Sequence, residues 1–74
     1  RRFEDAALFE RLRAVRLELA RDQGVPAYVI CHDRTLMEIA ADKPADRDAL
    51  AAVAGMGPAR IESYGDALLA AVKS

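Results

Sequence analysis

The chain is poor in the residues on which disulfides, metal centres and aromatic cores depend. Its 74 residues include one cysteine, one histidine, two tyrosines, two phenylalanines and no tryptophan. A single cysteine, Cys31, excludes an internal disulfide, and no apolar run approaches the 18 or so residues of a membrane span. We therefore expect a cytoplasmic protein in a reducing compartment, with no membrane partner.

Catalytic motifs are also missing. Cys31 and His32 are adjacent, but these two residues cannot supply four tetrahedral metal ligands unless several carboxylates converge on them. Of the two serines, Ser63 falls inside an expected helix and Ser74 ends the sequence, and neither has a neighbouring base. A Walker-type loop is absent. We expect no catalytic residue, no metal and no cofactor in this segment.

A basic surplus is the third absence. Eleven lysines and arginines oppose twelve aspartates and glutamates, which gives a formal net charge of −1. Residues 1–34 hold seven basic and six acidic residues, whereas residues 35–74 hold four and six. Strong binding to a nucleic-acid backbone needs many neutralised phosphates, so any such binding is expected to be weak.

The residues that are abundant favour an all-α fold. Hydrophobic residues make up 53% of the chain and are mostly alanine, leucine and valine, which suits small interdigitated helices in one domain. The sequence starts Arg1-Arg2-Phe3, with neither an initiator methionine nor a signal-peptide pattern. We expect a piece of a longer protein in which residues 1–4 are a linker remnant and residues 5–74 form the domain.

The longest helix is predicted over residues 5–23. Apolar residues recur there at helical spacing on one face, and Gly24 and Pro26 end the pattern; the apolar face comprises Leu8, Leu12, Val15 and Leu19. Arg13, Leu17 and Arg21 form a second stripe opposite that face. Leu17 is either buried against another element or part of a protein interface flanked by the two arginines.

Shorter elements follow. Residues 25–32 are expected to be an irregular, buried connector, because Pro26 favours extended backbone before it and the next apolar run is short. Asp33 is expected to cap a helix through about Ala41, with Thr35 and Glu38 as an alternative capping box. Lys43-Pro44 should end that helix, and Asp46 should cap another that runs through Val53.

A Gly55-Met56-Gly57 hairpin precedes a last helix, or pair of helices, from Pro58 to Lys73. Gly65 is expected to kink or restart this segment. Free amides at the start of the last helix suit a phosphate, so the hairpin is one candidate binding site. The alternative is a turn between packed helices in which Met56 fills the core.

Taken in order, these features resemble the HRDC domain of RecQ-type DNA helicases and ribonuclease D. The residues that carry the resemblance run from Gly24-Val25-Pro26-Ala27-Tyr28 through His32-Asp33-Arg34-Thr35-Leu36 and Pro44 to the Gly55-Met56-Gly57 hairpin, Arg60 and Tyr64-Gly65. The resemblance implies a compact, SAM-like bundle of about five helices with a helix-hairpin-helix-like element. It also implies a parent that unwinds DNA in the 3′–5′ direction with ATP and Mg²⁺ in its own core.

The same resemblance implies a weak single-strand site around an exposed aromatic near the second helix. Tyr28 matches that aromatic, although its apolar neighbours also fit a hydrophobic plug. Arg34 and Arg60 are the nearest basic residues in sequence to Tyr28 and the hairpin, and Gly55 and Gly57 supply backbone amides. Asp33, beside Arg34, opposes phosphate binding.

Three roles follow from the resemblance. The first is an accessory domain that binds single-stranded or structured DNA in repair and recombination at the nucleoid. The second is a regulatory module that docks on the helicase core or a partner protein and has little DNA affinity. The third is the accessory RNA-binding domain of an exonuclease of the ribonuclease D type.

Overall fold

The computed structural model describes residues 5–74, so the linker predicted at residues 1–4 lies outside the described part of the chain. The described residues form five helices and no strand: α1 (Ala6–Gln23), α2 (Ala27–Ile30), α3 (Asp33–Asp42), α4 (Arg47–Ala51) and α5 (Pro58–Lys73). The all-α prediction is confirmed. No helix among these residues is long and apolar enough to cross a membrane.

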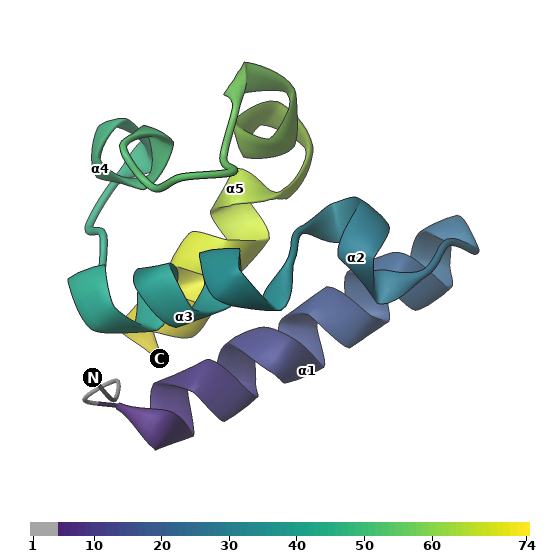
Figure 1. The fold of residues 1–74 in the computed structure, drawn as a ribbon, viewed down its shortest axis with the longest axis horizontal. Helices are drawn as coiled ribbons and strands as arrows, with labels where there is room; N and C mark the ends of the chain where they lie inside the picture. Colours follow the sequence, from purple (N-terminus) through teal and green to yellow (C-terminus); the bar gives the residue numbers. More distant parts are fainter. Residues whose placement is uncertain (1–4) are drawn as a thin grey trace.

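The two long helices, α1 and α5, carry most of the packing. α1 lies against α2, α3 and α5, while the main packing partner of the short α4 is α5 (Figure 1). The core is made almost entirely of small and branched aliphatic side chains, and its largest fully buried members are Leu8, Leu12, Ile30, Leu36, Ile39, Leu50 and Leu68. These residues come from all five helices, so each helix is held by burial of apolar surface.

α1 begins and ends as the sequence predicts. The Asp5 carboxylate accepts a hydrogen bond from the Leu8 amide at 2.9 Å, which caps the first turn. That hydrogen bond is the main reason why the pKa of Asp5 lies below its usual value. At the other end Gly24 takes φ 67° and its amide donates to the carbonyls of Ala20 and Arg21.

The expectation of an irregular, buried connector at residues 25–32 is wrong. Residues 27–30 form α2, and Tyr28 and Val29 are exposed while Ile30 and Cys31 are buried. A four-residue helix has little stability of its own, so sequence pattern alone does not reveal it. His32, not Asp33, is the N-cap of α3, and Asp33 is the first helical residue.

Two further predictions about helices need correction. α4 ends at Ala51, before the predicted Val53, although Asp46 caps it by accepting from the Ala49 amide at 2.9 Å. α5 is one continuous helix and does not restart at Gly65. Gly65 is buried, and a Cβ there would lie 3.3 Å from Ile61 Cγ2 of the same helix and at an ordinary contact distance of 3.7 Å from Leu50 Cδ2.

The hairpin between α4 and α5 has the architectural role that Met56 suggested. Met56 is buried in the core, and the Thr35 hydroxyl donates to the Ala54 carbonyl at 3.1 Å, which fastens the hairpin to α3. Thr35 therefore does not cap α3. Gly55 has φ 91°, and a Cβ there would overlap the Thr35 hydroxyl. Gly57 has φ −77° and open space around it, so only Gly55 is required by this turn.

Candidate nucleic-acid interface

The segment that carries Tyr28 is held by two arginines from opposite helices. Arg60 of α5 donates from Nε to the Ile30 carbonyl at 2.8 Å and from Nη2 to the Val29 carbonyl at 3.5 Å. Arg16 of α1 donates from Nη1 to the next carbonyl, that of Cys31, at 3.0 Å. Three consecutive carbonyls at the end of α2 thus have cationic donors, which fix the backbone of this short helix.

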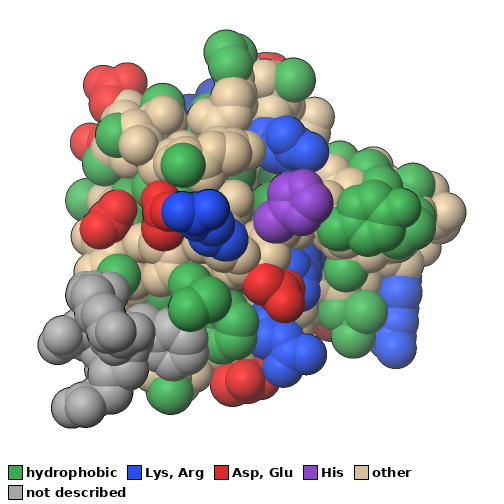
Figure 2. Space-filling model, in the orientation of Figure 1, with side chains coloured by type: hydrophobic (Ala, Val, Ile, Leu, Met, Phe, Trp, Pro, Cys, Tyr) green, Lys and Arg blue, Asp and Glu red, His purple; other side chains and the backbone are tan. Residues whose placement is uncertain are grey.

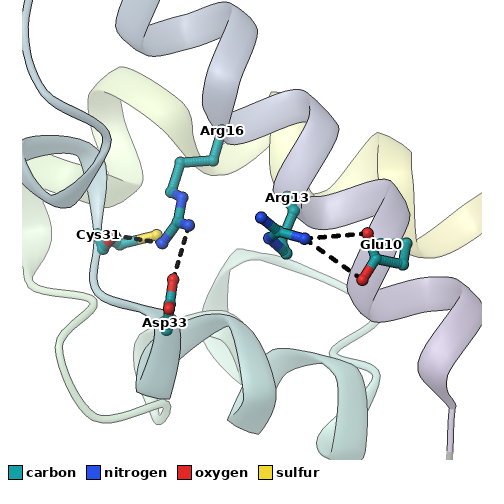
Figure 3. Close-up of polar contacts among 5 residues, drawn as sticks. All are labelled: Glu10, Arg13, Arg16, Cys31 and Asp33. Atoms are coloured by element: carbon teal, nitrogen blue, oxygen red, sulfur yellow. Dashed lines mark hydrogen bonds and ion pairs between the residues drawn. The ribbon is translucent and has the colours of Figure 1, made fainter.

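Arg16 was not predicted to matter, yet it is the most buried charged residue in the described part of the chain, at 8% exposure. Its Nη2 lies 2.6 Å from Asp33 Oδ1, so one guanidinium joins α1 to the α2–α3 junction (Figure 3). The spacing gives a signal, because Arg16 follows Leu8 and Leu12 at intervals of four on the buried face. Burial also raises the pKa of the adjacent Cys31 thiol.

Tyr28 is exposed and does not plug the core. Its side chain is 62% exposed, and its ring stacks on that of His32 with centroids 6.3 Å apart and planes 18° from parallel. The alternative in which Tyr28 is buried is therefore wrong. An exposed, nearly parallel aromatic pair on a fixed backbone offers flat surface to a planar ligand.

Two adjacent surface grooves meet at His32 and Arg34. The first is lined by Arg16, Ala27, Tyr28, His32, Asp33 and Arg34, and the second by His32, Arg34, Thr35, Glu38, Ala54 and Gly55. Figure 2 shows this face, with the histidine in purple between hydrophobic surface and basic side chains. The structure thus brings together Tyr28, Arg34 and Gly55, which the sequence had placed in one candidate site.

The remaining candidate residues lie differently. Arg60 is partly buried, and its guanidinium donates to backbone carbonyls of α2. It therefore supports the backbone of the candidate site and does not line either groove. Gly57 is the exposed N-cap of α5 and lines neither groove. Arg34 is highly exposed, and its Nε lies 3.9 Å from a Glu38 carboxylate oxygen. A solvent-exposed ion pair of this length does not hold the arginine side chain in one position.

The second stripe of α1 is also at the surface. Leu17 is 46% exposed, so the alternative in which it is buried is wrong. It lines a third groove with Glu10, Arg13, Ala14, Arg16 and Ala27. Arg13 is paired with Glu10 at 3.2 Å (Figure 3), and Arg21 is exposed but does not line this groove.

Comparison with known protein families identifies the family, because the sequence model of the HRDC domain family matches residues 5–72 of this chain. The chain belongs to the HRDC family. The fold agrees, since the solved "D. radiodurans RecQ HRDC domain 3" superposes with a TM-score of 0.89 at 41% identity, covering 92% of this chain and 90% of that one.

Helicases of two kinds are similar to this HRDC domain. It is 39% identical over 71 residues to the ATP-dependent DNA helicase RecQ of Bacillus subtilis, and 42% identical over 69 residues to the ATP-dependent DNA helicase UvrD2 of Mycobacterium tuberculosis. These matches cover 96% and 93% of this chain but only 12% and 10% of the helicases. HRDC domains are accessory parts of such proteins, and the chain spans about a tenth of their length.

The described part of the HRDC domain offers no group of three or more His, Cys, Asp or Glu side chains that could hold a metal. Its carboxylates face other partners: Asp33 is bound to Arg16, and Asp66 accepts two hydrogen bonds from Arg47. The described residues of the candidate site are an exposed aromatic pair with two arginines and two carboxylates beside it.

Proposed function

We propose that this HRDC domain binds single-stranded or structured DNA weakly through the surface around Tyr28 and so modulates which DNA substrates an attached ATP-dependent helicase engages. The observation that carries the proposal is the exposure of Tyr28 on a backbone held by Arg16 and Arg60. A base stacked on the ring contributes about 1–3 kcal/mol, and Arg34 supplies a contact to phosphate.

Weak binding follows from the charges that line the two grooves. Arg16 and Arg34 oppose Asp33 and Glu38, so the lining of the grooves has no excess of basic side chains. With few phosphates neutralised, we expect a dissociation constant of about 10⁻⁴ M or weaker at physiological salt. Such an affinity suits a domain that adds to the binding of a larger motor, because tethering raises the effective concentration of the strand.

The parent that we propose is a DNA helicase of the RecQ or UvrD2 kind, acting in repair or recombination at the nucleoid. It would use ATP and Mg²⁺ in its own motor core, and this segment would contribute no catalytic residue. Similarity to both kinds of helicase supports this proposal.

Fluorescence anisotropy of a labelled oligothymidylate at low salt tests the proposal. Tyr28→Ala should weaken binding at least about fivefold because the stacking contact is lost. Met37→Ala is the matched control, since Met37 is another exposed large hydrophobic side chain, on α3, and lines neither groove. Equal losses in the two variants, or no binding by the wild-type chain at low salt, would contradict the proposal.

Docking on the helicase core or a partner protein is a second candidate function. It is favoured by the exposed Leu17, which lines a groove on α1 that shares Arg16 and Ala27 with the groove of Tyr28. In the full-length parent, Leu17→Glu should change substrate preference and leave ATP hydrolysis intact if docking is the role. A change with Tyr28→Ala and none with Leu17→Glu would favour direct DNA binding.

A further inference from the structure

His32 is placed as an N-cap but does not use its side chain as one. It occupies the N-cap position of α3 with extended backbone, and its imidazole makes no capping hydrogen bond. Residues favoured at this position normally accept a bond from the first turn of the helix. The imidazole instead stacks on Tyr28 and remains exposed. Its two ring nitrogens are therefore not committed to α3.

The stacked rings sit on a rigid support. The backbone on either side of Cys31 is held by the Arg16 and Arg60 guanidinium groups, through the carbonyls of Ile30 and Cys31. Because the two ring planes lie 18° from parallel, a base stacked on Tyr28 is also nearly parallel to the imidazole. A base stacked on the other face of Tyr28 has the tyrosine ring between itself and the imidazole, so we expect a flanking phosphate to be the group that approaches His32.

The charged side chains that line the grooves around His32 sum to a formal charge of zero. A positive charge on His32 would therefore set the sign of the charge of the groove lining. The grooves that it lines receive Arg16 from α1 and Asp33, Arg34 and Glu38 from α3. These four groups cancel formally, and the segment at Ala54 and Gly55 adds no charge. The other facing titratable groups are Tyr28 on α2 and the buried Cys31, and Arg60 on α5 is bound to carbonyls.

We propose that His32 is a second DNA-contacting residue beside Tyr28 and that its protonation tightens single-strand binding as the pH falls. The inference rests on the proposed function, because it names a further contact in the same site. Histidine is the side chain that gains a positive charge between about pH 8 and pH 5. That proton changes the formal charge of the groove lining from zero to +1, next to the position expected for a phosphate.

The expected size follows from one additional phosphate contact. Neutralising one phosphate of a single strand steepens the dependence of log affinity on log salt by about 0.7. At low salt we expect binding to be about threefold to tenfold tighter at pH 5.5 than at pH 8.0. Oligothymidylate is the appropriate probe, since thymine and phosphodiester groups do not titrate over this range.

The test compares the wild-type chain with His32→Asn, His32→Lys and Tyr28→Ala at both pH values by anisotropy. Asparagine is a favoured N-cap, so the first variant keeps the helix start and removes the titrating group. His32→Asn should bind equally at both pH values, with the affinity of the wild type at pH 8.0. His32→Lys should match the acid form at both, and Tyr28→Ala should be weaker throughout.

Two results separate the inference from the function on which it rests. If the wild type binds and Tyr28→Ala weakens it, but the affinity is independent of pH or His32→Asn keeps the wild-type pH dependence, the role of His32 is overturned and the DNA site stands. If the wild type fails to bind at both pH values at low salt, the site and the role of His32 are both overturned.

Discussion

The hairpin at residues 54–58 connects α4 to α5, and the segment at residues 27–34 comprises α2 and its connection to α3, here called the α2–α3 junction. The two segments differ in which side chains they bury and which they leave exposed. The hairpin buries its central side chain, Met56, and uses Gly55 to fit against Thr35. The junction buries Ile30 and Cys31 and presents Tyr28 and His32 to solvent. A conspicuous glycine motif thus serves the architecture, while an ordinary tyrosine provides the surface available for binding.

The largest expected effect separates the two glycines of the hairpin. Gly55→Ser should lower the free energy of unfolding by at least about 2 kcal/mol. The backbone of the serine would have to keep a positive φ, and its Cβ would overlap the Thr35 hydroxyl. Gly57→Ser is the matched control. It has open space and a favoured N-cap position, so stability should change by less than about 0.5 kcal/mol.

Urea unfolding monitored by circular dichroism measures both variants. Equal destabilisation at the two positions would show that the turn depends on the pair of glycines and not on the contact between Gly55 and Thr35. That result would contradict the role given to Gly55 in fitting the hairpin against α3.

The next effect concerns the support of the junction. Arg16→Met should cost about 2 kcal/mol, because it removes the donor to the Cys31 carbonyl and the contact with Asp33 while it keeps most of the buried volume. Arg13→Met, on the exposed face of α1, should stay within about 0.5 kcal/mol. Thermal or urea unfolding of the two variants provides the measurement, and indistinguishable midpoints would contradict the role given to Arg16.

The smallest effect is at the periphery, away from both turns. The hydrogen bonds from Arg47 lower the pKa of Asp66, and the hydrogen bond from the Leu8 amide lowers that of Asp5. Because the folded-state pKa values lie below the unfolded ones, these groups stabilise the fold above the unfolded value near 4. That stability is lost as the pH falls through the folded values.

Unfolding free energies measured between pH 5 and pH 2 should therefore decline less steeply in Asp66→Asn than in the wild type. The effect should be modest, since both carboxylates are at the surface and screened by solvent. An unchanged slope in Asp66→Asn would show that its ion pair with Arg47 contributes nothing to the pH dependence.

Much of the fold could be predicted because local signals agree with tertiary packing. Leu8 and Leu12 mark the buried face of α1, Gly24 ends it, and Asp46 caps α4. The short helix α2 could not be predicted in this way, because it depends on contacts with residues distant in sequence: the burial of Ile30 and the hydrogen bonds from Arg16 and Arg60. Gly65 suggests a break in the sequence pattern, yet it lies buried within the continuous helix α5.

The candidate site was only partly accessible from the sequence. Tyr28 and Arg34 follow from the resemblance to HRDC domains, and the structure places them along the same groove. The stacking of His32 on Tyr28 could not be predicted from the sequence, because it depends on how α2 and α3 are joined. Arg60 was expected near phosphate, and its bonds to the α2 carbonyls became visible only in three dimensions.

The most direct test of where the domain engages DNA is an NMR titration of the 74-residue chain with oligothymidylate at low salt. We expect the largest amide shifts at Tyr28, His32 and Arg34, smaller ones at Gly55 on the groove edge, and a decrease of all of them as salt is added. Shifts centred on Gly57 and the start of α5, or no shifts at all, would contradict the assignment of binding to the α2–α3 junction.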